Sequence, residues 1–287
     1  MHTNKDLITS GWPDYQLLDS GDNEKLEQYG NSVLVRPEPQ ALWKPLKPEL
    51  WKSAHAVFAS VAGKGAWQEK KPFPKRWEIE WGDVRALIKL ASFKHTGIFP
   101  EQALNWEWVG ERVKALDKPH VLNLFGYTGI ASIVAAQAGA HVTHVDASKQ
   151  TIIWAQENAR LSGLAPKRIR YLVDDALKFA KRQVRRKQTY DGIILDPPAF
   201  GRGPQGEVWK IEEQLSELME TLPRLLAEKP GSFFLLNGYA AGYSAQSFLQ
   251  LVENFFDETK GEFGELAIQE SGSERRISSG IYVRFVR

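Results

Sequence analysis

The pattern of apolar and polar positions changes near residue 119. Before it, residues 77–81 alternate strictly, with two tryptophans and an isoleucine on one face and two glutamates on the other, as a half-buried strand requires. Gly82 and Asp83 predict a turn, and the apolar residues Leu87, Ile88 and Leu90 predict a returning strand. We therefore expect a small β-rich domain over residues 1–94. Most of its tryptophans are expected to pack in a core, with a base-stacking surface as the alternative.

After residue 119 the chain alternates between strand and helix patterns. This alternation is typical of a parallel sheet with helices on both faces, so we expect an α/β, Rossmann-like domain over residues 95–287. Residues 264–269 and 280–286 predict a hairpin at one edge of the sheet. The expected strands are 121–125, 141–145, 169–173, 191–195 and 232–236, and the expected helices are 130–139, 149–161, 176–187, 211–227 and 244–256.

Composition narrows the class of protein. Hydrophobic residues make up 43% and charged residues 25% of the 287 positions, which is typical of a globular chain. No apolar run approaches the roughly 20 residues of a membrane span, and residues 1–6 lack a signal-peptide pattern, so we expect a cytoplasmic protein. The net charge of +2 does not by itself indicate a polyanionic partner. The absence of cysteine excludes disulfides, thiolate metal sites and a thiol nucleophile within this chain.

Polar residues and glycines follow the predicted strands where a ligand of an open α/β sheet binds. The first strand leads into Phe125-Gly126-Tyr127-Thr128-Gly129, whose glycines let the backbone approach a ligand. Asp146 follows the second strand, about 20 residues after Gly126, the offset at which a carboxylate binds ribose hydroxyls. The Asp174-Asp175 pair follows the third strand.

This pattern favours S-adenosylmethionine over a dinucleotide. The pyrophosphate fingerprint G-x-G-x-x-G fails here because Thr128 stands in place of the middle glycine. S-adenosylmethionine carries no phosphate, and it needs carboxylates for its ribose hydroxyls and adenine amine, which Asp146 and one acid of the 174–175 pair supply. Each aspartate taken alone is as consistent with a helix N-cap.

The fourth strand ends in Asp196-Pro197-Pro198-Ala199-Phe200. The two prolines cannot donate to a strand ladder, so they stop the strand and hold a rigid edge that directs Asp196 and the proline carbonyls at the active site. Phe200 could stack on a planar base that has been taken out of its stack. An ordinary strand-ending turn with a core phenylalanine is the structural alternative.

The chain resembles class I S-adenosylmethionine-dependent RNA methyltransferases, especially those of large-subunit ribosomal RNA, whose fourth strand ends in D-P-P-x-F. The resemblance covers residues 91–287 and includes the segment 95–102 (HTGIFPEQ) and the segment 123–129 (NLFGYTG). It implies a class I methyltransferase sheet, Asp146 at the ribose, Asp175 at the adenine amine, and Phe99 and Gln102 at the methionine part. The expected cofactor-binding residues are Phe99, Gln102, Asn123, Phe125, Gly126, Tyr127, Thr128, Gly129, Asp146, Ala147, Asp175 and Ala176.

The absent cysteine restricts the chemistry that this resemblance implies. Relatives that methylate cytosine at C5 attack C6 with a cysteine thiolate, which this chain lacks. We therefore expect methylation of a base nitrogen, where catalysis is mostly alignment of the nucleophile, the methyl group and the sulfur. No metal is expected, since the six histidines show no ligand spacing. The expected catalytic residues are Asp196, Pro197, Pro198 and Phe200.

The substrate class rests on where the cations lie. Residues 178, 181, 182, 185 and 186 recur at helical spacing and form one basic face, which could track phosphates or could be a solvated surface. Methylation of a protein or small molecule, and a non-catalytic module that retains the cofactor fold, stay open. The sequence gives no indication of oligomeric state. The expected RNA-binding residues are Lys181, Arg182, Arg185, Arg202 and Lys210.

Overall fold

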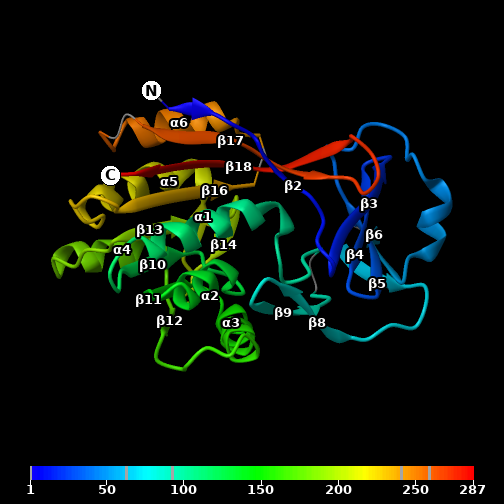
Figure 1. The fold of residues 1–287 in the computed structure, drawn as a ribbon, viewed down its shortest axis with the longest axis horizontal. Coiled ribbons are helices and arrows are strands. Elements are labelled where there is room, and N and C mark those ends of the chain that lie inside the picture. The colour runs from blue at the N-terminus through cyan, green and yellow to red at the C-terminus, as the bar shows by residue number, and fades with distance from the viewer. Residues whose placement is uncertain (1, 62–63, 92–93, 240–241, 258–259) are drawn as a thin grey trace. The chain divides into compact units, whose positions relative to one another are not determined.

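A computed structural model describes residues 2–61, 64–91, 94–239, 242–257 and 260–287, and the chain forms two compact units (Figure 1). Unit 1 comprises Met1–Leu7, Leu104–Leu266 and Gly280–Arg287, and unit 2 comprises Ile8–Ala103 and Ala267–Ser279. The two units therefore interleave along the sequence. The division into domains 1–94 and 95–287 stays a prediction.

Unit 1 is built on the main sheet, whose strand order is β1-β17-β18-β16-β13-β10-β11-β12, with β2 also pairing with β17. β10, β11, β12, β13 and β16 pair in parallel, and β18 pairs antiparallel with β16. This confirms the expected fold class. The strands are β1 (Thr3–Asn4), β2 (Leu7–Thr9), β10 (His120–Leu124), β11 (His141–Asp146), β12 (Ile169–Val173), β13 (Gly192–Leu195), β16 (Phe233–Gly238), β17 (Gly261–Gln269) and β18 (Arg276–Val286).

Helices cover both faces of this sheet (Figure 1). α4, α5 and α6 pack side by side, and α2 packs against α3 and β11. The centre of the sheet is apolar on both sides, since every residue of β13 and β16 is buried. The helices are α1 (Ala103–Lys114), α2 (Ile130–Gln137), α3 (Lys149–Leu161), α4 (Ala176–Arg185), α5 (Ile211–Thr221) and α6 (Ala245–Glu253), and none in the described residues is long and apolar enough to cross a membrane.

The predicted helices exist, but four of the five end earlier than expected: the helix expected over 130–139 ends at Gln137, that over 244–256 ends at Glu253, and two more have a clear physical reason. The helix expected over 211–227 ends at Thr221 and continues as the short 3-10 helix η3 (Leu222–Arg224), because Pro223 cannot continue an α-helical ladder. The helix expected over 176–187 ends at Arg185, and Lys187 has a left-handed φ of 53°. Both ends bring the chain back to the amino ends of the next strands.

Unit 2 holds a five-stranded sheet in the order β3-β4-β5-β6-β7 and the separate hairpin β8-β9. The hairpin confirms the expected pair of strands, with Trp77 opposite Ile88 and Ile79 opposite Ala86. The five-stranded sheet was not predicted. The elements are β3 (Tyr15–Gly21), β4 (Glu24–Tyr29), β5 (Ser32–Pro37), η1 (Pro48–Ser53), β6 (Ala56–Val61), β7 (Lys64–Glu69), β8 (Arg76–Trp81), β9 (Val84–Lys89) and η2 (Pro100–Gln102).

The tryptophans of unit 2 pack within it. The indole N–H of Trp51 donates to Asp19 Oδ2 at 2.8 Å, that of Trp77 to the Tyr29 carbonyl at 2.9 Å, and that of Trp67 to the Ala91 carbonyl at 3.0 Å. A half-buried indole whose N–H is fixed in this way stabilises the unit. The core-packing interpretation is therefore favoured over a base-stacking surface.

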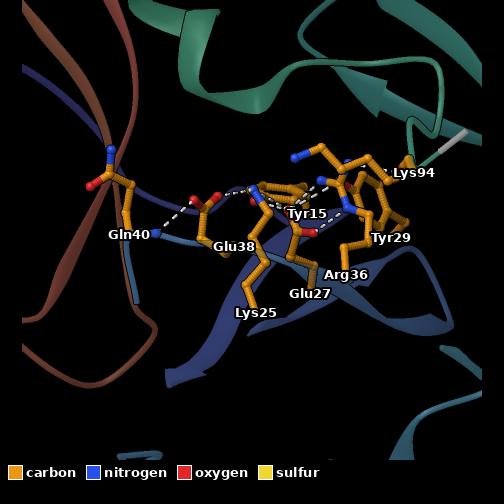
Figure 2. Close-up of polar contacts among 8 residues, drawn as sticks. All are labelled: Tyr15, Lys25, Glu27, Tyr29, Arg36, Glu38, Gln40 and Lys94. Carbon is orange, nitrogen blue, oxygen red and sulfur yellow. Dashed lines mark hydrogen bonds and ion pairs between the residues drawn. The ribbon is translucent and has the colours of Figure 1, made fainter. Parts of the chain in front are cut away.

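A charged network is buried inside the five-stranded sheet (Figure 2). Glu27 is fully buried, and the guanidinium group of Arg36 donates to both of its carboxylate oxygens, at 2.6 and 2.8 Å. Burial alone would raise the pKa of Glu27, but Arg36 and Lys25 hold it at about 2. Lys25 pairs in addition with Glu38 at 3.2 Å. The network therefore keeps buried charges on both strands paired, which is the condition for tolerating them.

Candidate active site

The glycine-rich turn after β10 has an unusual backbone. Phe125 and Tyr127 have left-handed φ values of 55° and 50°, and Gly129, with φ 84°, is the N-cap of α2. A non-glycine residue in this region costs on the order of 1 kcal/mol, and such strain concentrates at functional sites. The turn places three half-buried residues, Phe125 to Tyr127, at the carboxyl end of β10.

Gly126 is required by the side chain that lies beneath it. A Cβ at this position would lie 2.5 Å from Nδ1 of His144 on β11, closer than a real Cβ approaches any atom. Substitution at Gly126 would therefore lift the turn. His144 is fully buried and hydrogen-bonds Ser132 Oγ at 2.9 Å, and Asn123 Nδ2 donates to the same oxygen at 2.9 Å.

The buried supports of the turn include two expected cofactor-binding residues. Asn123 is 3% exposed and engages Ser132, and Thr128 is 1% exposed, with its carbonyl accepting from Asn158 Nδ2 at 2.9 Å. Direct contact of Asn123 and Thr128 with a cofactor stays a prediction. The sequence analysis missed three residues that support the turn: His144, Ser132 and Asn158. No sequence motif marks a buried residue that supports a turn by packing or hydrogen bonding.

Asp146 ends β11 beside this turn. Its Oδ2 accepts the backbone N–H of Tyr127 at 2.9 Å, and its Oδ1 accepts from the backbone N–H of Ser148 and the hydroxyl of Thr151, at 2.9 and 2.7 Å. These bonds orient the carboxylate and lock it to the glycine-rich turn. A carboxylate offers about four acceptor positions, so it can still accept from a ligand hydroxyl. Ala147, the next residue, is half-buried.

Asp175 is the N-cap of α4. Its Oδ1 accepts the backbone N–H of Lys178 at 2.8 Å, which is the capping role that the sequence analysis weighed against a cofactor contact. The two roles are compatible, since one oxygen suffices for the cap. Ala176, the first residue of α4, is buried. Asp174 instead pairs with Arg182, and the contact of Asp175 with a cofactor stays a prediction.

The Asp196 motif leads from β13 into a short hairpin. The hairpin consists of β14 (Phe200–Arg202) and β15 (Val208–Lys210), with Phe200 opposite Lys210 and Arg202 opposite Val208. Trp209, which is 4% exposed, donates its indole N–H to the Pro198 carbonyl at 2.7 Å, and its ring lies 4.7 Å from the Phe125 ring. Trp209 thus joins the proline motif to the glycine-rich turn, and the sequence analysis missed it.

One face of this hairpin carries one expected catalytic residue, Phe200, and two expected RNA-binding residues, Arg202 and Lys210. Because opposite residues of an antiparallel pair share a face, Phe200, Arg202 and Lys210 lie together with Val208. Phe200 is 57% exposed, so it is not the core phenylalanine that an ordinary strand-ending turn would have. Lys210 pairs with Glu213 at 2.6 Å. The hairpin therefore presents an aromatic ring beside cations directly after Asp196.

The basic face of α4 is largely paired with acids. Lys181 pairs with Glu217 of α5, Arg182 pairs with Asp174, and Lys178 pairs with Glu207 at 2.6 Å. These ion pairs neutralise the face on its first two turns, where it approaches the carboxyl ends of the strands. Arg185, near the helix end, is exposed. The interpretation of this part of the helix as a solvated surface therefore gains support.

Two expected cofactor residues belong to unit 2. Phe99 precedes η2, where the Gln102 backbone N–H donates to the Phe99 carbonyl at 3.0 Å, and the Phe99 ring lies 5.2 Å from that of His95. Their contact with the cofactor stays a prediction. Within the described parts of the chain, no three histidines or acids are grouped as a metal site would need.

Comparison with known proteins identifies the family of this chain. Residues 59–254 match the model of the family S-adenosylmethionine-dependent methyltransferase. The chain belongs to this family. The expected enzyme class and the expected cofactor, S-adenosylmethionine, are thereby confirmed.

Individual relatives agree with this assignment. The methyltransferase is similar to the crystal structure of the SAM-dependent methyltransferase from Agrobacterium tumefaciens, with 41% identity, a TM-score of 0.92, and coverage of 99% of this chain and 95% of that one. It is also 34% and 35% identical to ribosomal RNA large subunit methyltransferase K/L from Shewanella frigidimarina and Shewanella loihica, over 57% and 61% of this chain. The matched region spans only 23% and 24% of those two relatives.

The residues at the carboxyl edge fit this cofactor. Because Gly126 has no side chain, the turn can lie close to His144. The carboxylates of Asp146 and Asp175 lie at the carboxyl ends of the adjacent strands β11 and β12. Their acceptor oxygens match the hydroxyl and amine donors of an adenosine. The hairpin that follows β13 lies at the same carboxyl end of the sheet, because β13 is the neighbour of β10 on the side opposite to β11.

Proposed function

We propose that this methyltransferase transfers a methyl group to a nitrogen atom of a base in RNA, and that the RNA is ribosomal. The observation that carries the proposal is the exposed hairpin face after Asp196, on which Phe200 stands beside Arg202. An exposed aromatic ring stacks on a base, and a neighbouring guanidinium group contacts phosphate. The names of the two Shewanella relatives support the same substrate class. An RNA substrate of this kind accords with the expected cytoplasmic location.

Within this proposal, Asp146 accepts from the ribose hydroxyls of the cofactor and Asp175 from its adenine amine. The lock between Asp146 and the Tyr127 backbone N–H would place the cofactor against the glycine-rich turn. Calorimetry of Asp146→Ala tests this assignment, with Asp191→Ala at the opposite edge of the sheet as the control. Equal affinity of Asp146→Ala and the wild type for S-adenosylmethionine would refute it.

The chemistry needs little from the protein beyond alignment. When bound, S-adenosylmethionine supplies an electrophilic methyl group on a sulfonium. A base nitrogen donates its lone pair to form the new N–C bond, the S–C bond breaks, and its electron pair returns to sulfur. Asp196 accepts a hydrogen bond from an exocyclic amine and so orients that lone pair; the amine proton is then released to the carboxylate or to water. A ring nitrogen such as N7 of guanine loses no proton.

The absent cysteine favours nitrogen over cytosine C5. C5 is a poor nucleophile until a group adds at C6, and no thiolate exists in this chain to add there. Nitrogen attack needs a lone pair held in line with the methyl group. Pro197 and Pro198 provide a rigid edge for that alignment, and the Trp209 bond fixes the second of them.

The test is incubation with methyl-labelled cofactor and separated RNA, protein and small-molecule fractions. Label in ribosomal RNA that yields N-methylated nucleosides supports the proposal. Label only in the protein or small-molecule fraction would overturn the substrate class and leave the family assignment intact. Phe200→Ala is the matched variant, since it removes the stacking ring on the exposed face and leaves Trp209 in place.

A further inference from the structure

Six cations gather where the edge strand β12 begins and α4 ends. α4 starts at Asp175 beside the carboxyl end of β12, and the chain after it returns to Asp191, whose backbone pairs with His120 at the amino end of β10. The end of α4 therefore lies at the amino ends of the parallel strands, the same end of the sheet at which β12 begins. All six side chains are exposed, and we name them the amino-edge patch: Lys167, Arg168, Arg170, Arg185, Arg186 and Lys187.

Two elements that are separate in the sequence converge in this patch. Burial raises the pKa of the Tyr190 hydroxyl, and Arg170 of β12 and Arg186, the C-cap of α4, both oppose that shift. Both guanidinium groups are therefore within electrostatic reach of one side chain. Arg170 alternates with the buried Ile169, so its side chain points away from the core.

The patch differs from the rest of α4 in its ion pairing. Lys178, Lys181 and Arg182 each have an acidic partner, as described above. Among the described residues, no acid forms an ion pair with any of the six cations of the amino-edge patch. A helix carboxyl terminus attracts cations through its dipole, but this explains at most Arg185 and Arg186 and not Lys167 to Arg170. Within the part of the chain that the structure describes, the six cations thus lack the ion pairs that the cations on the first two turns of α4 form.

We propose that the amino-edge patch binds the phosphate backbone of the RNA substrate at a distance from the reacting base. α4 has ten residues at 1.5 Å each, so the patch lies about 15 Å from the carboxyl edge. The RNA segment bound at the patch therefore does not contain the reacting base. The patch contributes to the affinity for RNA and not to the methyl-transfer step. This inference rests on the proposed RNA substrate. The sequence predicts that Lys181 and Arg182 bind RNA, whereas this inference assigns RNA binding to the cations of the amino-edge patch.

The experiment compares two double variants that each remove two positive charges from the same part of unit 1. The first variant, Arg170→Gln with Arg186→Gln, changes the amino-edge patch. The second, Lys178→Gln with Lys181→Gln, changes two cations of α4 that form ion pairs with acids, and we call it the paired-face variant. Binding of fluorescently labelled, protein-free large-subunit ribosomal RNA is measured from 50 to 300 mM salt. We expect the patch variant to bind about 10-fold more weakly and to lose about two units of the salt slope. The paired-face variant should stay close to the wild type.

Turnover measurements separate this surface from the active site. The patch variant should keep the wild-type kcat at saturating RNA and the wild-type affinity for S-adenosylmethionine, and only its KM for RNA should rise. Equal weakening by the two double variants would mean that net charge alone matters, and it would overturn the inference. Unchanged RNA binding by a patch variant whose RNA methylation is intact would overturn the inference and leave the proposed function standing. Absence of any RNA methylation by the wild type would overturn both.

Discussion

The indole N–H of Trp209 donates to the carbonyl of Pro198 at 2.7 Å, while the same indole packs on Phe125. One side chain thus contacts the first residue of the glycine-rich turn and the second proline of the Asp196 motif. In the proposed reaction, the turn positions the methyl donor and the motif positions the base. Within that proposal Trp209 is a positioning residue, since it fixes the two against each other.

Trp209→Phe keeps an aromatic ring and removes the hydrogen bond. We expect kcat to fall on the order of 10-fold because the prolines lose their fixed position, while the affinity for S-adenosylmethionine stays unchanged. The free energy of unfolding should fall by about 1 kcal/mol. Tyr190→Phe, a buried aromatic at the opposite edge of the sheet, is the control that should lose stability and keep its kcat. A parallel loss of kcat in both variants would mean that Trp209 only stabilises the fold.

Gly126→Ala should weaken cofactor binding. The added methyl group would collide with the His144 ring, and overpacking that costs about 1–3 kcal/mol should weaken the binding of S-adenosylmethionine, measured by calorimetry, by about 5- to 150-fold. Gly110→Ala is the matched control, because its Cβ would meet Val134 at an ordinary 3.4 Å in the middle of α1. That variant should be unchanged in affinity and slightly more stable. Equal affinities of the two variants would show that the turn does not hold the cofactor.

The sequence predicts unit 1 well, because its central strands β10, β13 and β16 are buried on both faces and read as short apolar runs. It does not predict the sheet β3–β7. β4 carries the buried charges Lys25 and Glu27, which interrupt the alternation of apolar and polar residues that marks a strand. Their partner Arg36 lies on the next strand, and reciprocal charges of this kind leave only a weak signal in one sequence.

The candidate site shows the same limit. Asp146, the glycine-rich turn and the Asp196 motif are found because each stands directly after a strand. The partners of the cations on α4 are not found, because Glu207 and Glu217 are distant in sequence. The sequence therefore indicates the position of the candidate active site. It does not indicate which cations form ion pairs with acids and which are available to bind RNA.

Arg36→Met should strongly destabilise unit 2. The change leaves Glu27 buried without the guanidinium group that holds its pKa at about 2, and breaking a buried ion pair costs about 3–5 kcal/mol. Lys44→Met breaks an exposed ion pair with Asp22 in the same unit and should cost less than about 1 kcal/mol. Urea unfolding followed by tryptophan fluorescence measures both. Equal stabilities of the two variants would contradict the assignment of the network to the core.

His144 should make the methyltransferase unit sensitive to acid. Burial lowers the pKa of His144 to about 4, although Asp146 acts in the opposite direction. The unfolded chain takes up the proton near the ordinary pKa of about 6.5, so stability is complete above that pH and falls as the pH drops toward 4. His144→Gln should reduce the slope of stability against pH in this window by about one proton. A slope that stays at the wild-type value in His144→Gln would contradict the account.

The identity of the methylated atom tests the central claim most directly. RNA methylated by the purified protein is digested to nucleosides and analysed by mass spectrometry, with Asp196→Ala as the variant that should lose turnover far more than cofactor affinity. The account predicts a nucleoside with the methyl group on a base nitrogen. Recovery of 5-methylcytidine would contradict it, because a chain without cysteine would then have activated cytosine C5.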